Sequence, residues 1–139
     1  MTDKFAQGEQ LMHRMMGPEF AAGMKANVES GSFGADLGRF AVEHAFADVW
    51  SRPGLELKHR SMIVIAALIA SGHADELRNH VRFGLGNGIT PDEMQEILYQ
   101  TYPYVGFPAA SKAIRVMIEV LRETGQAGGA RTAHESGLL

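Results

Sequence analysis

The chain has 139 residues, a length that fits one domain with one hydrophobic core. Hydrophobic residues make up 45% of it, which is typical of a globular protein and excludes a disordered chain. The formal net charge is -3, with 13 basic and 16 acidic side chains well mixed, so no basic patch for nucleic acid is present. The cysteine count is 0, which excludes disulfides, thiolate metal sites and cysteine-based redox or nucleophilic chemistry.

Neither end of the sequence nor its middle predicts a membrane partner. The longest apolar run, 62–70, is shorter than the roughly 20 residues that a membrane-spanning helix needs. The N-terminal residues 1–4 contain no apolar signal core. We therefore expect a cytoplasmic protein.

The hydrophobic periodicity predicts an all-α fold, because apolar residues recur at helical spacing and no segments pair as strands. We expect a single helical domain of about six helices over residues 1–125. The predicted helices cover residues 4–16, 34–51, 56–71, 74–86, 91–102 and 109–124, and a further short helix is possible over 19–28. Glycine and polar residues dominate after residue 125, which predicts a disordered tail over 126–139.

Three local signals set the predicted helix ends. Thr90, Pro91 and Glu93 form a capping box, with threonine as N-cap, proline at the first helical position and glutamate three residues after the cap. Gly72 is placed to cap the preceding helix. The segment 103–108 contains two prolines and a glycine, and we expect it to interrupt the chain between the last two helices.

The segment from Met62 to Ala70 is apolar around its whole circumference, so a helix there must be covered on all sides. A chain of 139 residues with short helices can hardly provide that cover alone. Burial between subunits would provide it, and we expect a homo-oligomer. The alternative is an ordinary central helix in a monomeric bundle.

A stripe of ionisable residues follows this apolar run. At helical spacing His73, Glu76 and His80 fall on one face, with Leu77 beside them. Half-buried histidine and glutamate titrate abnormally and gather where proton chemistry takes place. Spacing alone favours the other interpretation, the solvated face of a surface helix, because charged helix faces are common.

Several short motifs follow one another along the chain in a fixed order. They are Trp50-Ser51-Arg52-Pro53-Gly54-Leu55, Arg60-Ser61, Glu76-Leu77 with His80, Gly88-Ile89-Thr90, Glu93 with Glu96, and Tyr104-Val105-Gly106-Phe107-Pro108-Ala109-Ala110. This ordered set, over about residues 10–123, resembles the carboxymuconolactone decarboxylase family. The resemblance implies an all-helical subunit that assembles into rings, as trimers or hexamers, with a site between helices near the subunit interface.

The family also has an alkylhydroperoxidase-D-type branch, which carries a Cys-x-x-Cys-x-x-x-His signature. The matching positions here run from His73 to His80, so the final histidine is kept and both cysteines are absent. Thiol peroxidase activity needs a thiolate nucleophile and a resolving thiol. The chain lacks both, which excludes that activity and favours the decarboxylase branch.

The decarboxylase branch implies a small carboxylated unsaturated lactone of aromatic catabolism as substrate. When carbon dioxide leaves, the conjugated carbonyl takes up the electron pair as a dienolate. The protein must bind carboxylates, stabilise the oxyanion and then protonate carbon. Arginine suits the first two tasks because its charged fork matches carboxylate oxygens. Histidine suits the third, and this acid/base chemistry needs no cofactor.

We assign three catalytic residues on this basis. His80 is the proton donor, and Glu76 orients it and raises its pKa, or acts as the partner acid/base. Arg60 binds the substrate anion or stabilises the oxyanion. A structural ion pair with Glu76 is the alternative role of Arg60.

Four further residues are candidates for substrate binding. Arg52 and His44 are second candidates for the substrate carboxylates. Trp50 is a candidate wall of the pocket, although core packing is favoured for a large aromatic side chain. Tyr104 is expected to line the site from the loop before the last helix. His59 is left out because it would face away from Arg60's side of a helix.

Two alternatives to a cofactor-free decarboxylase stay open. One is a non-catalytic oligomer of the same fold that binds a small acidic ligand or a protein partner. The other is a metal-assisted enzyme that uses His73, Glu76 and His80 as ligands. Their spacing spreads the three side chains over two helical turns, which is long for one ion, so we expect no metal site.

Overall fold

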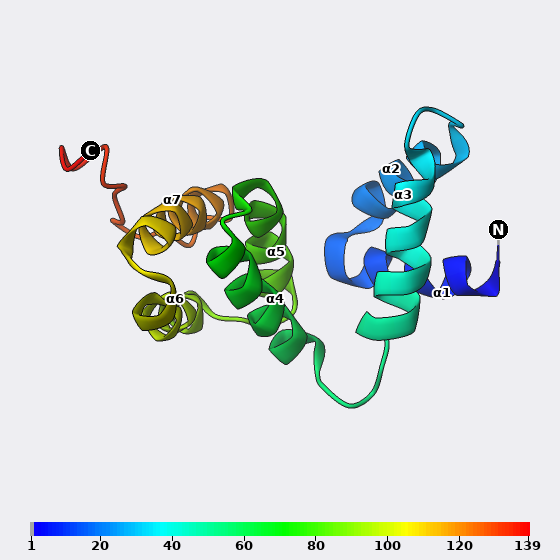
Figure 1. Ribbon diagram of the computed structural model, residues 1–139, viewed down its shortest axis with the longest axis horizontal. Coiled ribbons are helices and arrows are strands. Elements are labelled where there is room, and N and C mark those ends of the chain that lie inside the picture. The colour runs from blue at the N-terminus through cyan, green and yellow to red at the C-terminus, as the bar shows by residue number, and fades with distance from the viewer. Residues whose placement is uncertain (1) are drawn as a thin grey trace. The chain divides into compact units, whose positions relative to one another are not determined.

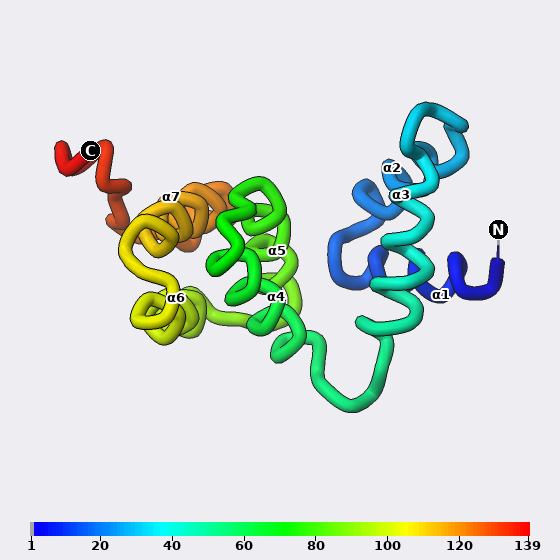
Figure 2. The backbone as a smooth tube through the Cα atoms, in the orientation of Figure 1, coloured from blue at the N-terminus to red at the C-terminus, as the bar shows by residue number. Residues whose placement is uncertain are grey.

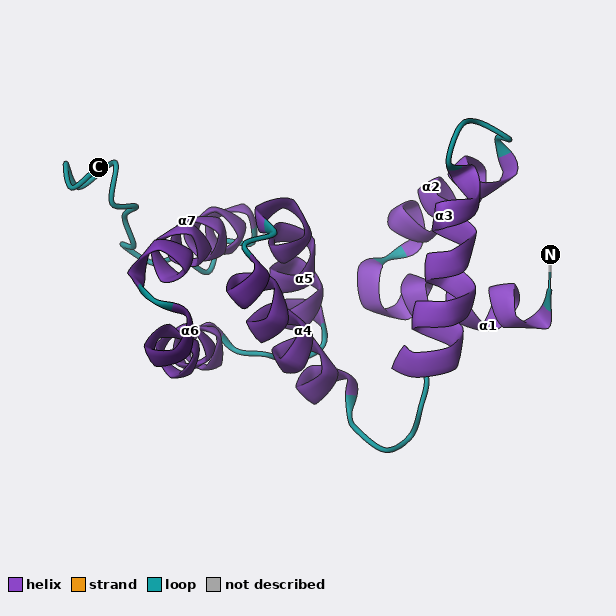
Figure 3. Cartoon of the chain, in the orientation of Figure 1, coloured by secondary structure: helices purple, strands orange, loops and turns teal. Residues whose placement is uncertain are grey.

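The computed structural model describes residues 2–139, and within this range every regular element is a helix (Figure 3). The elements are α1 (Asp3–Met16), α2 (Pro18–Glu29), α3 (Ala35–Phe40), η1 (Ala41–Trp50), α4 (Leu57–Ser71), α5 (Ala74–Gly86), α6 (Pro91–Val105) and α7 (Phe107–Glu123). The predicted all-helical class is confirmed. The contacts divide the chain into two compact units, one ending at Leu57 and one beginning at Lys58.

In the first unit, α1 packs closely against η1. Thr2 caps α1 by accepting a hydrogen bond from the Phe5 backbone N–H at 3.1 Å. One turn further on, Gly8 faces Val42, and a Cβ at Gly8 would lie 2.1 Å from the Val42 carbonyl oxygen. Glycine is therefore required at this crossing, because any side chain would push the two helices apart. The buried apolar side chains of this unit are Phe5, Leu11, Met12, Met15, Ala21, Ala35, Val42, Phe46, Ala47 and Trp50.

The helix predicted over 34–51 is two elements. After α3, the backbone widens into a π-helix, η1, and the Ser51 N–H donates to the Phe46 carbonyl, five residues earlier, at 3.1 Å. The hydrophobic pattern did not predict this change. The spacing of apolar residues indicates a helical face but does not separate i to i+4 from i to i+5 hydrogen bonding. π-Helical segments are rare and often occur at functional sites.

The second unit consists of α4, α5, α6 and α7 (Figure 1). α7 packs against both α5 and α6. All four helices contribute to one core, together with the segment before α6. Its buried members are Ile65, Ile69, Leu77, Val81, Ile89, Met94, Leu98, Ala110, Ala113, Val116, Met117 and Val120.

α4 and α5 form an antiparallel hairpin. The chain leaves α4, turns at Gly72 and returns as α5 beside it (Figure 2). Gly72 has φ +72°, as predicted for a glycine cap, and its N–H donates to the Ile69 carbonyl at 3.3 Å. At the other end of the hairpin, the Asn87 side-chain amide donates to the Ser61 hydroxyl at 2.9 Å.

The capping box at the start of α6 is confirmed. The Thr90 hydroxyl accepts from the Glu93 N–H, and the Glu93 carboxylate accepts from the Thr90 N–H, each at 3.1 Å. The end of α6 differs from the prediction, because the helix continues through Pro103 to Val105. A proline in the last turn removes only one backbone bond, and the helix stops at Gly106, whose φ is +85°.

The C-terminal segment after Glu123 contains turns and no helix. It is tied to α7 by Arg122, whose guanidinium donates to the Glu135 carboxylate at 2.6 and 2.5 Å and to the Ala130 carbonyl at 2.9 Å. The Thr132 side chain in this segment is buried.

None of the helices described in residues 2–139 combines the length and the apolar character that crossing a membrane requires.

Candidate functional site

α5 presents three faces to its surroundings. Leu77, Val81 and Gly84 face the core, in the order expected of a helix that buries one stripe. On the α7 side, Arg78 pairs with Glu119, and Arg82 donates to Glu123 at 2.7 Å. The predicted catalytic stripe, with Glu76 and His80, lies next to the core face.

His80 is the titratable group of this stripe whose environment is most unusual. Its ring is half-buried and meets Phe83 edge-on, with the ring centroids 5.5 Å apart and the planes at 81°. Burial lowers the pKa of the His80 imidazole below its ordinary value, and the nearby Glu76 carboxylate raises it by a smaller amount. The imidazole is therefore neutral at neutral pH.

Glu76 raises the His80 pKa, as predicted, but burial lowers it by more, so the net shift is downward. Glu76 is exposed, so water screens its charge, whereas the imidazole itself lies in a poorly hydrated place. A neutral imidazole has one nitrogen that donates and one that accepts a hydrogen bond.

Arg60 lies in the first turn of α4, at the end of the hairpin where α5 finishes. Its neighbour Ser61 is fully buried against Gly84 and Asn87. Glu76 lies at the opposite end of the hairpin, in the first turn of α5. From the level of Gly84, which Ser61 contacts, α5 rises about 6 Å to His80 and about 12 Å to Glu76.

His80 and Glu76 therefore lie on one helix, one turn apart. Measured along the axis of the hairpin, the backbone of Arg60 is closer to the level of His80 than to that of Glu76. Both roles considered for Arg60, binding of a substrate anion and an ion pair with Glu76, stay predictions. His73, the third member of the stripe, is exposed and bonds through Nδ1 to the Ser71 hydroxyl at 2.7 Å.

Three of the predicted substrate-binding residues belong to the first unit. Trp50, at the end of η1, is buried and stacks on Phe46 with ring centroids 5.8 Å apart, which is the core role favoured from the sequence. His44, also in η1, is exposed and stacks flat on Phe40 at 5.6 Å. Arg52 follows η1 and is exposed. The roles of His44 and Arg52 toward a substrate stay predictions.

Tyr104 belongs to the second unit and is 84% exposed. It was expected in a loop, but it lies in the last turn of α6 because that helix continues past Pro103. Its substrate-binding role also stays a prediction.

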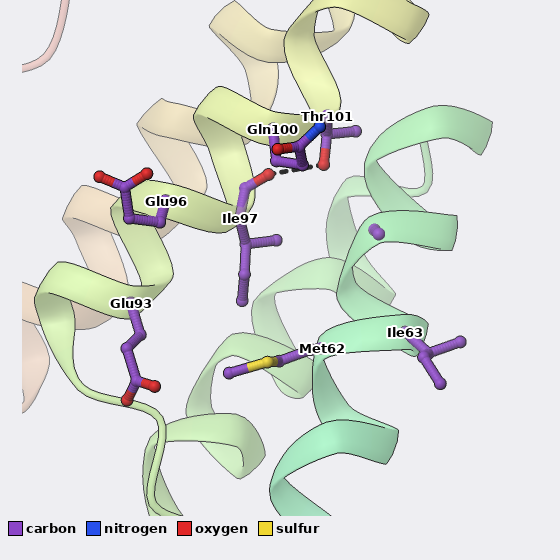
Figure 4. A pocket seen from close by; sticks show the side chains of 8 residues that line it. Met62, Ile63, Glu93, Glu96, Ile97, Gln100 and Thr101 are labelled. Atoms are coloured by element: carbon purple, nitrogen blue, oxygen red, sulfur yellow. Dashed lines mark hydrogen bonds between the residues drawn. The ribbon is translucent and has the colours of Figure 1, made fainter.

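An open pocket of about 460 Å³ lies between α4 and α6, and the sequence did not predict it (Figure 4). Its apolar wall comes from Met62 and Ile97, which reach into the space between the two helices. Lys58 pairs with Glu93 at 2.8 Å, and this ion pair lowers the pKa of the Glu93 carboxyl. The full lining is Met62, Ile63, Ala66, Glu93, Glu96, Ile97, Gln100 and Thr101. The apolar positions of α4 and α6 were visible in the sequence, but not which of their faces would meet.

Among residues 2–139, no group of three or more histidine, aspartate or glutamate side chains is placed to hold a metal ion.

One protein family and several known proteins are similar to this chain. The model of the carboxymuconolactone decarboxylase family matches residues 35–119, a range that contains all seven predicted site residues. A 4-carboxymuconolactone decarboxylase of Acinetobacter baylyi is 35% identical over 88% of this chain and 90% of its own length. A nitrosuccinic acid decarboxylase of Metarhizium robertsii is 27% identical over 86% of this chain and 82% of its own. An uncharacterized 15.0 kDa protein of Paracoccus denitrificans is 33% identical over 59% of this chain and 63% of its own.

Two of these relatives are named as decarboxylases, which supports a carboxy-lyase activity. The family match covers more than half of the chain, and the relative from Acinetobacter covers nearly all of it. The chain therefore belongs to the carboxymuconolactone decarboxylase family.

Proposed function

We propose that the protein is a cofactor-free decarboxylase that acts on a small carboxylated unsaturated lactone by acid/base chemistry. The observation that carries the proposal is the half-buried His80, whose imidazole is kept neutral by burial while Glu76 lies one turn away. An imidazole that takes up a proton when an anion binds beside it can supply the proton that carbon protonation requires. The names of the two decarboxylase relatives support the reaction class.

The reaction divides into two steps. First, the bond between the substrate carbon and its carboxylate breaks, carbon dioxide leaves, and the electron pair moves to the conjugated lactone carbonyl as a dienolate. Second, the dienolate carbon takes one proton from the imidazolium of His80. One proton enters from water, through His80, for each carbon dioxide released.

Charge explains why His80 acquires its proton only when substrate is bound. A carboxylate placed beside the imidazole would raise the His80 pKa, adding to the effect of Glu76 and opposing that of burial. Arg60 precedes Ser61, whose contact with Gly84 lies about 6 Å from the level of His80, so it is suited to hold a second anionic group of the substrate near the proton donor.

The two named substrates of the relatives share the chemistry that this site needs. Each name describes a carboxylic acid with a second electron-withdrawing group, a lactone carbonyl in one case and a nitro group in the other. Either group can accept the electron pair that decarboxylation leaves behind. The substrate class is therefore a small polycarboxylate that carries such an acceptor.

Turnover of 4-carboxymuconolactone, followed as loss of ultraviolet absorbance, tests the proposal. We expect His80→Ala to lower kcat about 10²- to 10⁴-fold, as for loss of a positioned proton donor. His13→Ala is the matched control, because His13 is an exposed histidine of α1. Arg60→Ala is expected to raise KM, with the exposed Arg115→Ala as control. Wild-type rates in folded His80→Ala and Arg60→Ala would refute the assignment.

Two controls address the alternatives. Turnover that persists in a metal chelator would argue against the metal-assisted enzyme, and turnover that is lost would support it. Binding of the lactone without turnover, measured by calorimetry, would favour the non-catalytic ligand-binding oligomer.

We also propose that the chain associates with copies of itself, as a trimer or hexamer, through the outer face of α4. This face carries His59, Ile63, Ala67 and Ala70, all exposed, and the Ile63 side chain is 58% exposed. Apolar surface of this kind is stabilised by burial. In a hexamer built from two-fold pairs, an axis between positions 66 and 67 would set Ile63 of one copy against the small Ala70 of the other, so the side chains are complementary in size.

A further inference from the structure

A hydrogen bond joins Ser61 of α4 to Asn87, the residue that caps the end of α5. Ser61 is 0% exposed, and its hydroxyl accepts a hydrogen bond from the Asn87 side-chain amide at 2.9 Å. A buried hydroxyl is costly without a partner, so this bond is required for α4 to lie where it does. Asn87 also ends α5, since its backbone N–H donates to the Phe83 carbonyl at 2.9 Å.

Close packing beside this hydrogen bond limits how far α4 and α5 can move relative to each other. A Cβ at Gly84 would lie 3.0 Å from Ile65 Cδ1, 3.0 Å from Ile89 Cδ1 and 3.6 Å from the Ser61 Cβ. The two helices therefore approach each other at the Gly84 backbone, and the hydrogen bond fixes their register along the axis. Rotation or sliding of either helix would break the bond or create a steric clash.

The junction is adjacent to both proposed catalytic elements. Arg60 immediately precedes Ser61 on α4, and His80 is one turn before Gly84 on α5. We propose that Ser61 and Asn87 are positioning residues, whose hydrogen bond sets the turn that carries Arg60 against the helix that carries His80. The effect of these two residues on turnover rests on the proposed function, whereas their effect on the position of α5 does not.

The imidazole of His80 provides a direct measure of this positioning. Burial is the larger of the two effects on its pKa, so movement of α5 that admits water would raise the pKa towards its ordinary value. The exposed Glu76 carboxylate is on the same helix and moves with it, so its effect stays nearly constant. The His80 pKa, read from ring proton shifts by NMR and assigned with His80→Gln, therefore reports the position of α5.

The variants are Ser61→Ala, Asn87→Ala and the double variant. We expect each single variant to raise the His80 pKa and to lower kcat/KM about 10- to 100-fold, as for a small misplacement of catalytic groups. The double variant should have the same effect as either single variant, because all three remove the same bond. Asn79→Ala is the matched control, since Asn79 is next to His80 in the chain and its side chain accepts a hydrogen bond from Arg82 of its own helix.

The outcomes separate the two proposals. An unchanged His80 pKa in Ser61→Ala, or an equal change in Asn79→Ala, would overturn the positioning role. Additive effects in the double variant would also overturn it, because they would indicate two independent structural contributions. If the wild-type protein decarboxylates no lactone, the proposed function fails, while the NMR measurement still decides the role of Ser61 and Asn87. Ser61→Ala removes a single atom from the core, so it keeps the test open if Asn87→Ala does not fold.

Discussion

Gly8 and Val42 are in backbone contact, and a Cβ on Gly8 would lie 2.1 Å from the Val42 carbonyl oxygen. This close approach sets the distance between α1 and η1, on which the packing of the first unit depends. A carbonyl oxygen cannot rotate away as a flexible side chain does. A methyl group on Gly8 would therefore clash with the Val42 backbone unless the helices move apart.

Gly8→Ala should therefore destabilise the protein by about 2 kcal/mol, the usual cost of overpacking a core. The measurement is the free energy of unfolding in urea. Gly23→Ala is the control, because Gly23 lies in α2 with nothing within 4 Å of an added Cβ. That substitution should be neutral or stabilise the chain by up to about 1 kcal/mol, since alanine favours helix. Equal effects at the two positions would contradict the argument.

The pKa of His80 predicts a pH dependence of stability with a definite sign. Above pH 7 the imidazole is neutral in both the folded and the unfolded chain. As the pH falls through about 6.5, the unfolded chain binds the proton first, so the free energy of unfolding decreases. The decrease ends below the lowered folded pKa and amounts to about 1.4 kcal/mol for each unit of lowering.

His80→Gln removes this contribution and leaves the other histidines unchanged. Between pH 8 and pH 5 we expect the variant to lose less stability than the wild-type protein, measured by urea unfolding at each pH. Parallel stability curves for the two proteins would show that the folded chain does not lower the His80 pKa.

The C-terminal segment offers a test of an ion pair. The Arg122 guanidinium, followed by the Thr132 backbone N–H, lowers the pKa of the Glu135 carboxyl to about 2. The contact is complete above the ordinary carboxyl pKa and is lost as the pH falls through about 2. Glu135→Gln at neutral pH should release the segment, and trypsin should then cleave more rapidly after Arg131. Glu19→Gln, an exposed change in α2, should leave the cleavage rate unaltered. Equal rates in all three proteins would argue against a tethered segment.

Self-association through α4 has its own prediction. Ile63→Asp places a charge on the outer face of α4, which would have to be desolvated in the proposed contact. We expect the molar mass, from a sizing column with light scattering, to fall towards that of a monomer. Leu37→Asp, at a 73% exposed apolar residue of α3, is the control for a new surface charge. A monomeric wild-type protein would refute the proposal, as would an oligomer that Ile63→Asp leaves intact.

Local chemistry in the sequence was sufficient to predict most helix ends. Thr90 and Glu93 cap α6 as expected, and Gly72 ends α4, because capping depends on a few neighbouring residues. The bounds of α5 were also predicted. The π-helical hydrogen bonding of η1 and the continuation of α6 through Pro103 were not, since packing decides between backbone geometries of similar energy.

The candidate site was also predicted only in part. Helical spacing was enough to predict that Glu76 and His80 share a face of one helix, one turn apart. The sign of the His80 pKa shift and the contact between Ser61 and Asn87 could not be predicted from the sequence. Both depend on the surroundings that other helices create, because hydration and distance between helices are properties of the packed chain and not of any one segment.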